Sequence, residues 1–259
     1  MDDIKLWEKR NYLVVKSNDL VQKSRYELSL LEQKVVACIC SLIKPEHAKE
    51  AMENGHTLEY QFNIRDFCRI CGIDCNNGKN YINVRAVLKK LSDRSIWLTM
   101  PDGKIVLCRW LSKVKIQPRS GIAEIRLDED MVPYLFDLNE KFIRYNLKDI
   151  LAMQSAYSIR VFEILKSHSF KKKVEYQFDD LKKLLYVDNI KVYDNFKDFR
   201  VKILDKSIAE INSLTDINVF YEIKKEGRKT NSIVFYISKK NIREITVSTI
   251  KVRSLLEAQ

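Results

Sequence analysis

The chain has 259 residues, and 46% hydrophobic content with only six glycines and four prolines is typical of ordered globular domains rather than disordered or fibrous chains. Its net charge is +11, with 22 basic against 18 acidic residues up to residue 130 and 24 against 17 beyond it, which favours a polyanionic partner such as a nucleic acid. We expect a cytoplasmic protein with reduced cysteines, because the chain shows neither a signal pattern nor an apolar run near the roughly 20 residues that span a bilayer.

The amino-terminal part predicts a short strand at residues 13–16, followed by a helix. Ser29 and Glu32 have the spacing of a capping box, in which each side chain satisfies a free backbone amide at the start of a helix. Apolar residues then recur at helical spacing until Pro45 ends the run. These apolar residues are Leu31, Val35, Ile39 and Leu42.

The middle of the chain predicts a strand, two helices and a hairpin. The predicted elements are a strand at residues 58–62, helices at 64–71 and 79–93, strands at 96–100, 105–110 and 123–127, and a helix at 131–138. Gly72 is a C-cap type of residue after the first of these helices. Pro101-Asp102-Gly103-Lys104 separates two β-rich runs, and Asp-Gly in that position is a strong hairpin signal. We expect the tip of this hairpin to be the wing of a first winged helix.

The last part of the chain predicts a similar order of elements. We place the seam between two domains within residues 139–146. Beyond it, the predicted elements are a helix at 156–168, a strand at 174–178, helices at 179–186 and 195–212, and strands at 219–223 and 233–237. The second hairpin has a basic tip at residues 224–229. The sequence pattern does not place the segment after Lys239 in either domain's order of elements.

A short internal repeat supports two related domains. Leu58-Glu59-Tyr60-Gln61-Phe62 returns 116 residues later as Val174-Glu175-Tyr176-Gln177-Phe178, and Val87-Leu88 returns at the same offset as Ile203-Leu204. Internal repeats determine architecture before other signals do. The sequence therefore predicts an α+β protein with two tandem winged-helix domains, at residues 1–138 and 139–259.

In a winged helix, the second helix of the helix-turn-helix enters the major groove and the wing contacts the DNA backbone beside it. We expect apolar residues of each such helix to be buried and polar ones to face DNA. The expected buried residues are Tyr81, Val84, Leu88 and Leu91 in the first helix, and Phe196, Phe199, Ile203 and Ile211 in the second. The candidate DNA-binding residues are Lys79, Asn80, Asn83, Arg85 and Lys89, then Asn195, Lys197, Arg200, Lys202 and Lys206, and in the second wing Lys224, Lys225, Arg228 and Lys229.

The sequence gives little support for metal binding, nucleotide binding or catalysis. Cys68, Cys71 and Cys75 lack the remaining ligands of a zinc or iron–sulfur site, and Cys68 and Cys71 fit the apolar side of a helix. Residues 72–80 differ from a phosphate-binding loop, because their glycine spacing is one residue too long and Asn80 replaces the Ser or Thr that would bind magnesium. The three histidines are isolated from one another. We therefore expect a protein that is not an enzyme and needs no metal or cofactor.

Two segments resemble the Rep proteins, the replication initiators of iteron-controlled, theta-replicating plasmids. The first consists of residues 13–20 (Leu-Val-Val-Lys-Ser-Asn-Asp-Leu) and 28–34 (Leu-Ser-Leu-Leu-Glu-Gln-Lys). The second runs from Phe196 through Leu204 to Asn212, and continues from Thr215 to Glu222 and on to Gly227-Arg228. The resemblance covers nearly the whole chain and agrees with the predicted order of elements.

The resemblance implies a protein that binds short direct repeats in double-stranded DNA at a plasmid origin in the bacterial cytoplasm. It implies opening of an adjacent A+T-rich region and recruitment of the host replicative helicase and initiator proteins. A monomer–dimer equilibrium would let the dimer repress its own promoter at an inverted repeat and control copy number. The resemblance assigns dimerisation and further DNA contacts to the first domain and the main sequence-specific binding to the second. The cysteines of the first domain are not expected from the family.

Three alternatives are compatible with parts of the sequence. A tandem winged-helix transcriptional repressor would share the fold and charge but bind an inverted repeat as a stable dimer. A DNA-processing enzyme would need the metal and nucleophile arrangement that the sequence lacks. A protein–protein adaptor would use the winged helices as docking surfaces, which the basic second wing disfavours.

Overall fold

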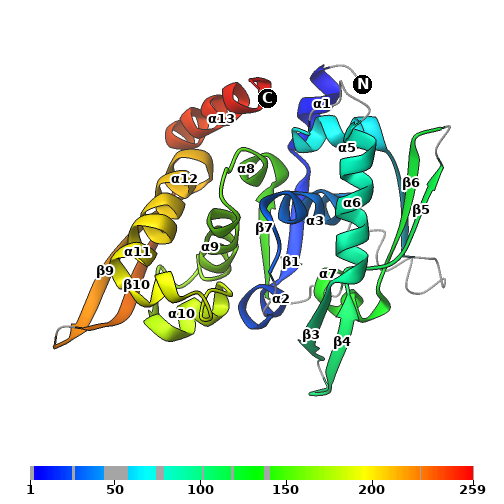
Figure 1. Cartoon of the computed structure of the whole chain (residues 1–259). Coiled ribbons are helices and arrows are strands. Elements are labelled where there is room, and N and C mark those ends of the chain that lie inside the picture. The colour runs from blue at the N-terminus through cyan, green and yellow to red at the C-terminus, as the bar shows by residue number, and fades with distance from the viewer. Residues whose placement is uncertain are drawn as a thin grey trace. The chain divides into compact units, whose positions relative to one another are not determined.

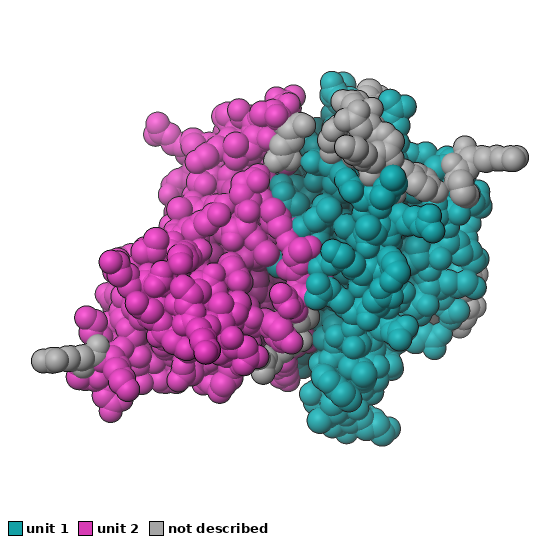
Figure 2. Space-filling model, viewed as in Figure 1, with its two compact units in different colours: residues 1–20, 31–151, 259 teal, residues 21–30, 152–258 magenta. Residues whose placement is uncertain are grey.

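The computed structural model describes residues 3–24, 27–43, 58–73, 79–100, 102–117, 120–136, 141–227 and 229–258 (Figure 1). The chain forms two compact units (Figure 2). Unit 1 consists of Met1–Leu20, Leu31–Leu151 and Gln259, and unit 2 of Val21–Leu30 and Ala152–Ala258. Among the helices of these described ranges, none has the length and apolar character that crossing a membrane requires.

Unit 1 contains a winged helix with additions. In chain order, its elements are α1 (Asp3–Arg10), β1 (Leu13–Ser17), α2 (Asn18–Lys23), α3 (Leu30–Leu42), β2 (Glu59–Asn63), α5 (Ile64–Cys71), α6 (Lys79–Asp93), β3 (Ser95–Thr99), β4 (Ile105–Arg109), β5 (Leu111–Gln117), β6 (Ile122–Leu127), a 3-10 turn (Glu129–Met131), α7 (Val132–Leu135), β7 (Phe142–Asn146) and α8 (Leu147–Leu151). Both α2 and α3 extend across a unit boundary. The strands form an antiparallel sheet in the order β2-β6-β5 and two separate pairs, β3-β4 and β1-β7.

The helix-turn-helix of unit 1 follows from its caps and its apolar residues. The side-chain oxygen of Asn63 accepts hydrogen bonds from the amides of Arg65 and Asp66, which starts α5. Gly72, with φ +68°, ends it in the left-handed conformation that glycine adopts without steric cost. Inner positions of the two helices are buried: Ile64, Phe67, Cys68, Val84, Leu88 and Leu91. The helices predicted at 64–71 and 79–93 are confirmed.

The predicted hairpin around Asp102-Gly103 is present, but it does not occupy the position in the sheet that the wing of a winged helix holds. Trp97 pairs with Leu107 across β3 and β4, and Gly103 has φ +84° at the turn. β2, the strand before the helix-turn-helix, pairs instead with β6, which also pairs with β5. The wing of unit 1 is therefore the β5–β6 hairpin. Figure 1 shows the β3–β4 and β5–β6 hairpins as separate projections of unit 1.

Unit 2 repeats the winged-helix order. Its elements are α9 (Ala156–Ser167), β8 (Lys173–Gln177), α10 (Phe178–Leu184), a 3-10 turn (Lys191–Asp194), α11 (Phe196–Phe199), a π-helical segment (Arg200–Asp205), α12 (Lys206–Leu214), β9 (Ile217–Glu226), β10 (Lys229–Lys239) and α13 (Ile242–Glu257). The antiparallel sheet has the order β8-β10-β9. The carboxy-terminal helix α13, which sequence reasoning did not place, begins with a capping box between Asn241 and Glu244.

The internal repeat corresponds to the same position in the two sheets. Tyr60 of β2 pairs with Ile125 of β6, and Tyr176 of β8 pairs with Ile233 of β10. Since β6 and β10 each also pair with the other strand of a hairpin, β2, β5 and β6 are equivalent to β8, β9 and β10. The two tandem winged-helix domains expected from the sequence are present.

The division into units differs from the boundary expected after residue 138. Strand β7 lies within the expected seam and pairs with β1, for example Tyr145 with Val14. Ile143 and Tyr145 are buried, so this strand contributes to the core of unit 1. Contacts between strands far apart in sequence thus extend unit 1 to Leu151.

Candidate nucleic-acid interface

The second helix of the unit 2 helix-turn-helix has one buried side and one exposed side. Phe199, Ile203 and Ile211 are fully buried, as expected, and the Phe178 ring packs edge-on against Phe199 at 5.1 Å between centroids. Phe196 is only partly buried. Packing of this side fixes the helix, so the opposite side is presented to solvent. Its exposed candidate residues are Lys197, Arg200, Lys202 and Lys206.

Two of these cations are held in place by acidic residues. Arg200 Nε lies 3.6 Å from Asp205 Oδ2, and Lys202 Nζ lies 3.0 Å from Asp198 Oδ1. The Tyr221 hydroxyl, on β9, donates a hydrogen bond to Asp205 at 2.5 Å. Burial and the neighbouring Asp205 carboxylate raise the pKa of Tyr221 above its usual range. Asp205 therefore contacts both Arg200 on the helix and Tyr221 on the wing.

Asn195 has a structural role that the sequence reasoning did not assign. Its side-chain oxygen accepts a hydrogen bond from the Lys197 amide at 2.9 Å and so caps α11. Val201 lies among the basic residues and is 51% exposed. An exposed valine here is a candidate for apolar contact with a thymine methyl group. The signal that could have found it is its position outside the apolar periodicity of the helix.

The wing of unit 2 is a long hairpin whose turn contains Gly227 at φ +59° (Figure 1). Lys225 and Lys229 are exposed close to this turn, while the predicted contact Arg228 lies outside the described residues. Lys224 Nζ instead lies 2.7 Å from the Glu175 carboxylate, which also accepts a hydrogen bond from Ser232. These two partners hold the pKa of Glu175 below its usual range. Lys225 and Lys229 are thus better placed for phosphates than Lys224 is.

In unit 1, α6 presents its polar residues on two flanks of an exposed side. At 3.6 residues per turn, Arg85 and Lys89 share one flank and Asn83 lies on the other. All three are exposed, and Lys89 Nζ lies 2.5 Å from Asp93. The side chains of the predicted contacts Lys79 and Asn80, and of the expected core residue Tyr81, lie outside the described part of the chain.

The β5–β6 wing brings cations to unit 1 that the sequence reasoning missed. Lys113 is exposed, and Lys115 Nζ lies 3.3 Å from Glu124, the residue opposite it on β6. Arg126 pairs with Glu129 at 2.7 Å. The alternation of lysine with apolar residues from Lys113 to Ile116 is the strand signal that could have indicated this wing.

The described cysteines of unit 1 belong to its core. Cys68 and Cys71 are buried on α5, and burial raises the pKa of the Cys71 thiol, with a further contribution from Cys38. Cys75 lies outside the described residues. Among the residues described, no group of three or more His, Cys, Asp or Glu side chains is arranged to hold a metal ion.

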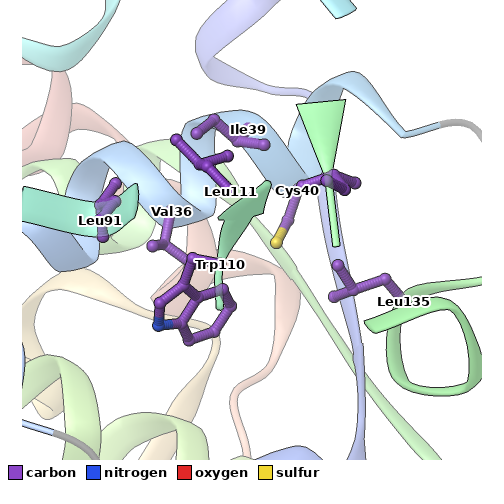
Figure 3. Close-up of a pocket in the computed structure, with 8 residues that line it drawn as sticks. Val36, Ile39, Cys40, Leu91, Trp110, Leu111 and Leu135 are labelled. Carbon is purple, nitrogen blue, oxygen red and sulfur yellow. The ribbon is translucent and has the colours of Figure 1, made fainter. Parts of the chain in front are cut away.

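A small cavity of about 10 Å³ lies in the same core (Figure 3). Its lining combines apolar side chains from α3, α6, α7 and the strands β5 and β6 with Trp110. About one water-sized sphere would fill this volume. The cavity is therefore a packing gap and not a ligand site.

Comparison with known proteins follows the same two-part organisation. The family described as "Initiator Replication protein, WH1" matches residues 13–166, and the family described as "Initiator Rep protein, WH2" matches residues 177–237. A replication initiation protein of Escherichia coli is 26% identical over 231 residues, which cover 87% of this chain and 69% of that protein. The PI protein of Escherichia coli is 30% identical over 138 residues, which cover 47% of this chain and 45% of the relative.

A solved structure shows the same fold at low sequence identity. The Pi initiator protein, in a crystal structure with iteron DNA, has a TM-score of 0.68 and 22% sequence identity to this chain. The similarity covers 90% of this chain and 99% of that protein.

Proposed function

The chain belongs to the family of plasmid replication initiators, and from this premise we propose that it binds direct repeats, or iterons, at a plasmid origin in the bacterial cytoplasm. The observation that carries the proposal is the exposed basic side of α11–α12. On this side, the Arg200 guanidinium lies beside the Asp205 carboxylate, which favours one orientation of the arginine. Arginine that is fixed in this way suits the acceptor pair of guanine in the major groove. The Pi initiator, which has the same fold, was crystallised with iteron DNA.

Each part of the candidate interface has a proposed role. Arg200 and Val201 read base edges, and the cap residue Asn195 lies at the entry of this helix into the groove. Phosphate contacts come from the remaining exposed residues of both units, because phosphate binding positions a protein without reading sequence. These residues are Asn83, Arg85 and Lys89 of α6, Lys197, Lys202 and Lys206 of the second helix, and Lys224, Lys225 and Lys229 of its wing, with Lys79, Asn80 and Arg228 retained as sequence-based candidates. We propose that unit 2 supplies most sequence specificity.

A two-domain binder of this kind should cover about two turns of DNA, with one major groove for each domain. If it neutralises about eight phosphates, the logarithm of its affinity should fall with the logarithm of salt concentration at a slope of about −7. The protein acts in this proposal by binding and deforming DNA and not by covalent catalysis. Cleavage of supercoiled DNA in the presence of magnesium or manganese would contradict that part of the proposal.

DNase footprinting of the DNA that flanks the coding region tests the proposal. Protection of evenly spaced direct repeats, about two helical turns apart, is the expected result. Protection of a single inverted repeat would instead support the alternative function, a tandem winged-helix repressor without initiator activity. Absence of protection at low salt would contradict DNA binding.

We also propose that unit 1 mediates self-association through the β3–β4 hairpin. Trp97 and Leu107 pair on its outward face, and Trp97 is 62% exposed. β3 and β4 each pair only with the other among the described strands. The Arg109 amide donates to Asp128 and the Thr99 carbonyl accepts from Tyr134, and we propose that a second copy pairs along the rest of an edge. Sedimentation should show a dimer that Trp97→Ala weakens, and an unchanged dimer would exclude this surface. The dimer would repress the protein's own promoter.

Origin opening and recruitment of the host helicase and initiator proteins complete the proposed function. Binding that bends or untwists DNA favours strand separation at flexible A+T-rich steps. Permanganate reactivity of thymines beside the repeats should rise when this protein and the host initiator are added together. Helicase should then protect the same region. Thymine reactivity that does not change when this protein is added would be compatible with DNA binding but would contradict the initiator role.

A further inference from the structure

A groove lies between α12 and α13 in unit 2, and the start of β9 contributes to its lining. Its volume is about 360 Å³. Ligand pockets in proteins have volumes from about 300 Å³ upward. The candidate DNA-binding residues named above do not belong to the described lining of this groove. The groove is therefore large enough for a ligand and separate from the candidate DNA interface.

Buried polar contacts fix the two helices that form the groove. Lys240 is buried, and its Nζ donates hydrogen bonds to the backbone carbonyls of Asn212 at 2.6 Å and Thr215 at 2.9 Å. It also donates to Ser248 Oγ at 2.8 Å, on the buried side of α13. Lys240 thus connects the end of α12 to α13, and the groove is part of the packed fold.

The wall that α13 contributes combines two cations with apolar side chains. Arg243, Val247 and Lys251 line the groove and follow one another at intervals of four residues, which places them on one side of the helix. Val247 is 62% exposed, and its neighbour Ile250 is 65% exposed. At 1.5 Å per residue, the two cations lie about 12 Å apart along the helix axis. The wall therefore presents two positive charges with an apolar strip between them.

The two cations of this wall remain available to an anion. Arg243 and Lys251 are exposed and have no carboxylate partner among the described residues, whereas Arg253 of the same helix is paired with a carboxylate at 2.7 Å. Glu244, the carboxylate of the described lining, takes part in the capping box of α13 and accepts a hydrogen bond from Asn218 at 3.0 Å. The groove therefore favours a negatively charged ligand.

The position of the groove argues against duplex DNA as that ligand. Asn218 lies near the start of β9 and Gly227 in the wing turn after it, so roughly 30 Å of strand separate the groove from the turn. Figure 1 shows α13 beside α12, away from the turn between β9 and β10. Phosphates would also satisfy the cations but leave Val247 and Ile250 exposed.

We propose that this groove binds an acidic peptide segment of a partner protein. Carboxylates of the segment pair with Arg243 and Lys251, and an apolar side chain between them covers Val247 and Ile250. An extended peptide rises about 3.3 Å per residue, so acidic residues three or four positions apart match a separation of about 12 Å. A pyrophosphate group concentrates its charge at one point and does not match it. The inference goes beyond the proposed function, since it does not require bound DNA.

Fluorescence anisotropy of the full chain tests the proposal with the labelled peptide Asp-Asp-Ile-Leu-Asp-Asp. Lys251→Gln should weaken binding of this peptide about threefold, and Lys251→Gln combined with Arg243→Gln about tenfold, because each removes a partly exposed ion pair. Val247→Ser should weaken it about threefold by removing apolar contact. Arg253→Gln is the matched control, since it removes one positive charge from the same helix outside the groove and should leave binding unchanged.

The substituted side chains are exposed, so the melting temperature should stay the same. If Lys251→Gln lowered it, Lys251→Arg, which keeps the charge, would still have to bind the peptide as the wild-type protein does. Absence of peptide binding to the wild-type protein would overturn the inference. An equal loss in Arg253→Gln would also overturn it, as would equal affinity for the peptide Asp-Asp-Ser-Ser-Asp-Asp.

Two further measurements distinguish other ligands of the groove. Displacement of the peptide by an equal concentration of pyrophosphate would overturn the inference in favour of a phosphate site. Weaker binding of the duplex repeat by the double variant at Arg243 and Lys251 would overturn it in favour of a DNA contact. Duplex binding by the wild-type protein without peptide binding would overturn the inference alone and leave the proposed function in place.

Discussion

The two second helices of the helix-turn-helix units hold the same place in the element order but present their charges differently. α6 runs without interruption from Lys79 to Asp93. Its exposed Lys89 pairs with Asp93, whereas its arginine, Arg85, has no ion pair among the described contacts. The helix of unit 2 contains a π-helical segment, and Arg200 in it is held by Asp205 and, through Asp205, by Tyr221. π-helical turns inside α-helices are frequent at functional sites.

This difference separates two requirements of DNA binding. A side chain that reads a base must be held in one direction, whereas a side chain that contacts phosphate needs only charge and reach. Arg200 of the second helix meets the first requirement, and Arg85 of α6 meets the second. We therefore expect substitutions in unit 2 to change specificity and those in unit 1 to change affinity for all sequences alike.

The largest expected effect is on stability and applies to both units. Phe199→Ala should lower the free energy of unfolding by about 3–5 kcal/mol, because Phe199 is fully buried and packs against the Phe178 ring. Leu88→Ala in α6 is the counterpart in unit 1 and should cost about 2–5 kcal/mol. Urea unfolding measures both. If either variant lowered the free energy of unfolding by less than 1 kcal/mol, that residue would not be essential to the packing of its helix.

The second prediction tests the contrast directly. Arg200→Ala should reduce discrimination between the repeat and unrelated DNA by about 1–3 kcal/mol, whereas Arg85→Ala should weaken binding to both without changing their ratio. Competition binding with the two DNAs measures the ratio. Tyr221→Phe should move discrimination in the direction of Arg200→Ala by a smaller amount, since it removes one hydrogen bond from Asp205. Equal effects of Arg200→Ala and Arg85→Ala would remove the distinction between the helices.

Much of this contrast could be predicted from the sequence, since residue spacing determines which helix positions are buried. Gly72 and the apolar periodicity located the bounds of α5 and α6. The ion pair between Arg200 and Asp205 could not be predicted in the same way. These residues are five positions apart, and they share a side of the helix only because of the i→i+5 turn of the π-helical segment, which no sequence pattern indicates.

The wing of unit 1 shows where local signals are insufficient. Asp102-Gly103 is the stronger turn signal, yet β2 pairs with β6, which lies about 60 residues away along the chain. Such pairing depends on tertiary contacts that a local pattern does not contain. The capping box of α13, formed by Asn241 and Glu244, was present in the sequence but preceded a run too weakly apolar to indicate a helix.

A third prediction separates the two roles of Asn195. Asn195→Ala should lower the free energy of unfolding by about 1 kcal/mol, because it removes the cap of α11. Asn195→Asp keeps the cap but adds a negative charge at the candidate interface, so it should preserve stability and weaken DNA binding. Asn63→Asp in unit 1 is the matched control, since Asn63 caps α5 in the same way. Unchanged binding by Asn195→Asp would leave Asn195 with the cap role alone.

A fourth prediction tests which hairpin is the wing of unit 1. Lys113→Ala on β5 should weaken binding to every DNA sequence and make the salt slope shallower by about 1. Lys104→Ala, in the turn of the β3–β4 hairpin, should leave both quantities unchanged, because Lys104 already pairs with Asp102 at 2.7 Å. Binding titrations at several salt concentrations measure the slope. If Lys104→Ala weakened binding and Lys113→Ala did not, the β3–β4 hairpin would be the one that contacts DNA.

The smallest expected effect concerns pH, and it too distinguishes the units. His168 is buried in unit 2, with Nε2 2.8 Å from the Tyr176 hydroxyl, and burial together with Lys171 lowers its pKa below 6.5. A lowered pKa means that the folded state favours neutral imidazole, so its contribution to stability is present above pH 6.5 and is lost as the pH falls below that value. The other two histidines, His47 and His56, lie outside the described residues.

Thermal melting at pH 7.5 and pH 5.5 measures this contribution. His168→Gln keeps a polar group beside Tyr176 but cannot titrate, so it should lose less stability between the two pH values than the wild-type protein does. The charge change is confined to the end of α9 and the start of the unit 2 sheet. After correction for the intrinsic slowing of amide exchange at lower pH, the protection of the β8 amides should therefore decrease at pH 5.5 in the wild-type protein only. An equal pH response in the variant would assign the effect to groups other than His168. Glu175 is not one of these groups, because its pKa lies below its usual value of 4.5 and its contribution to stability is lost only as the pH falls below that value.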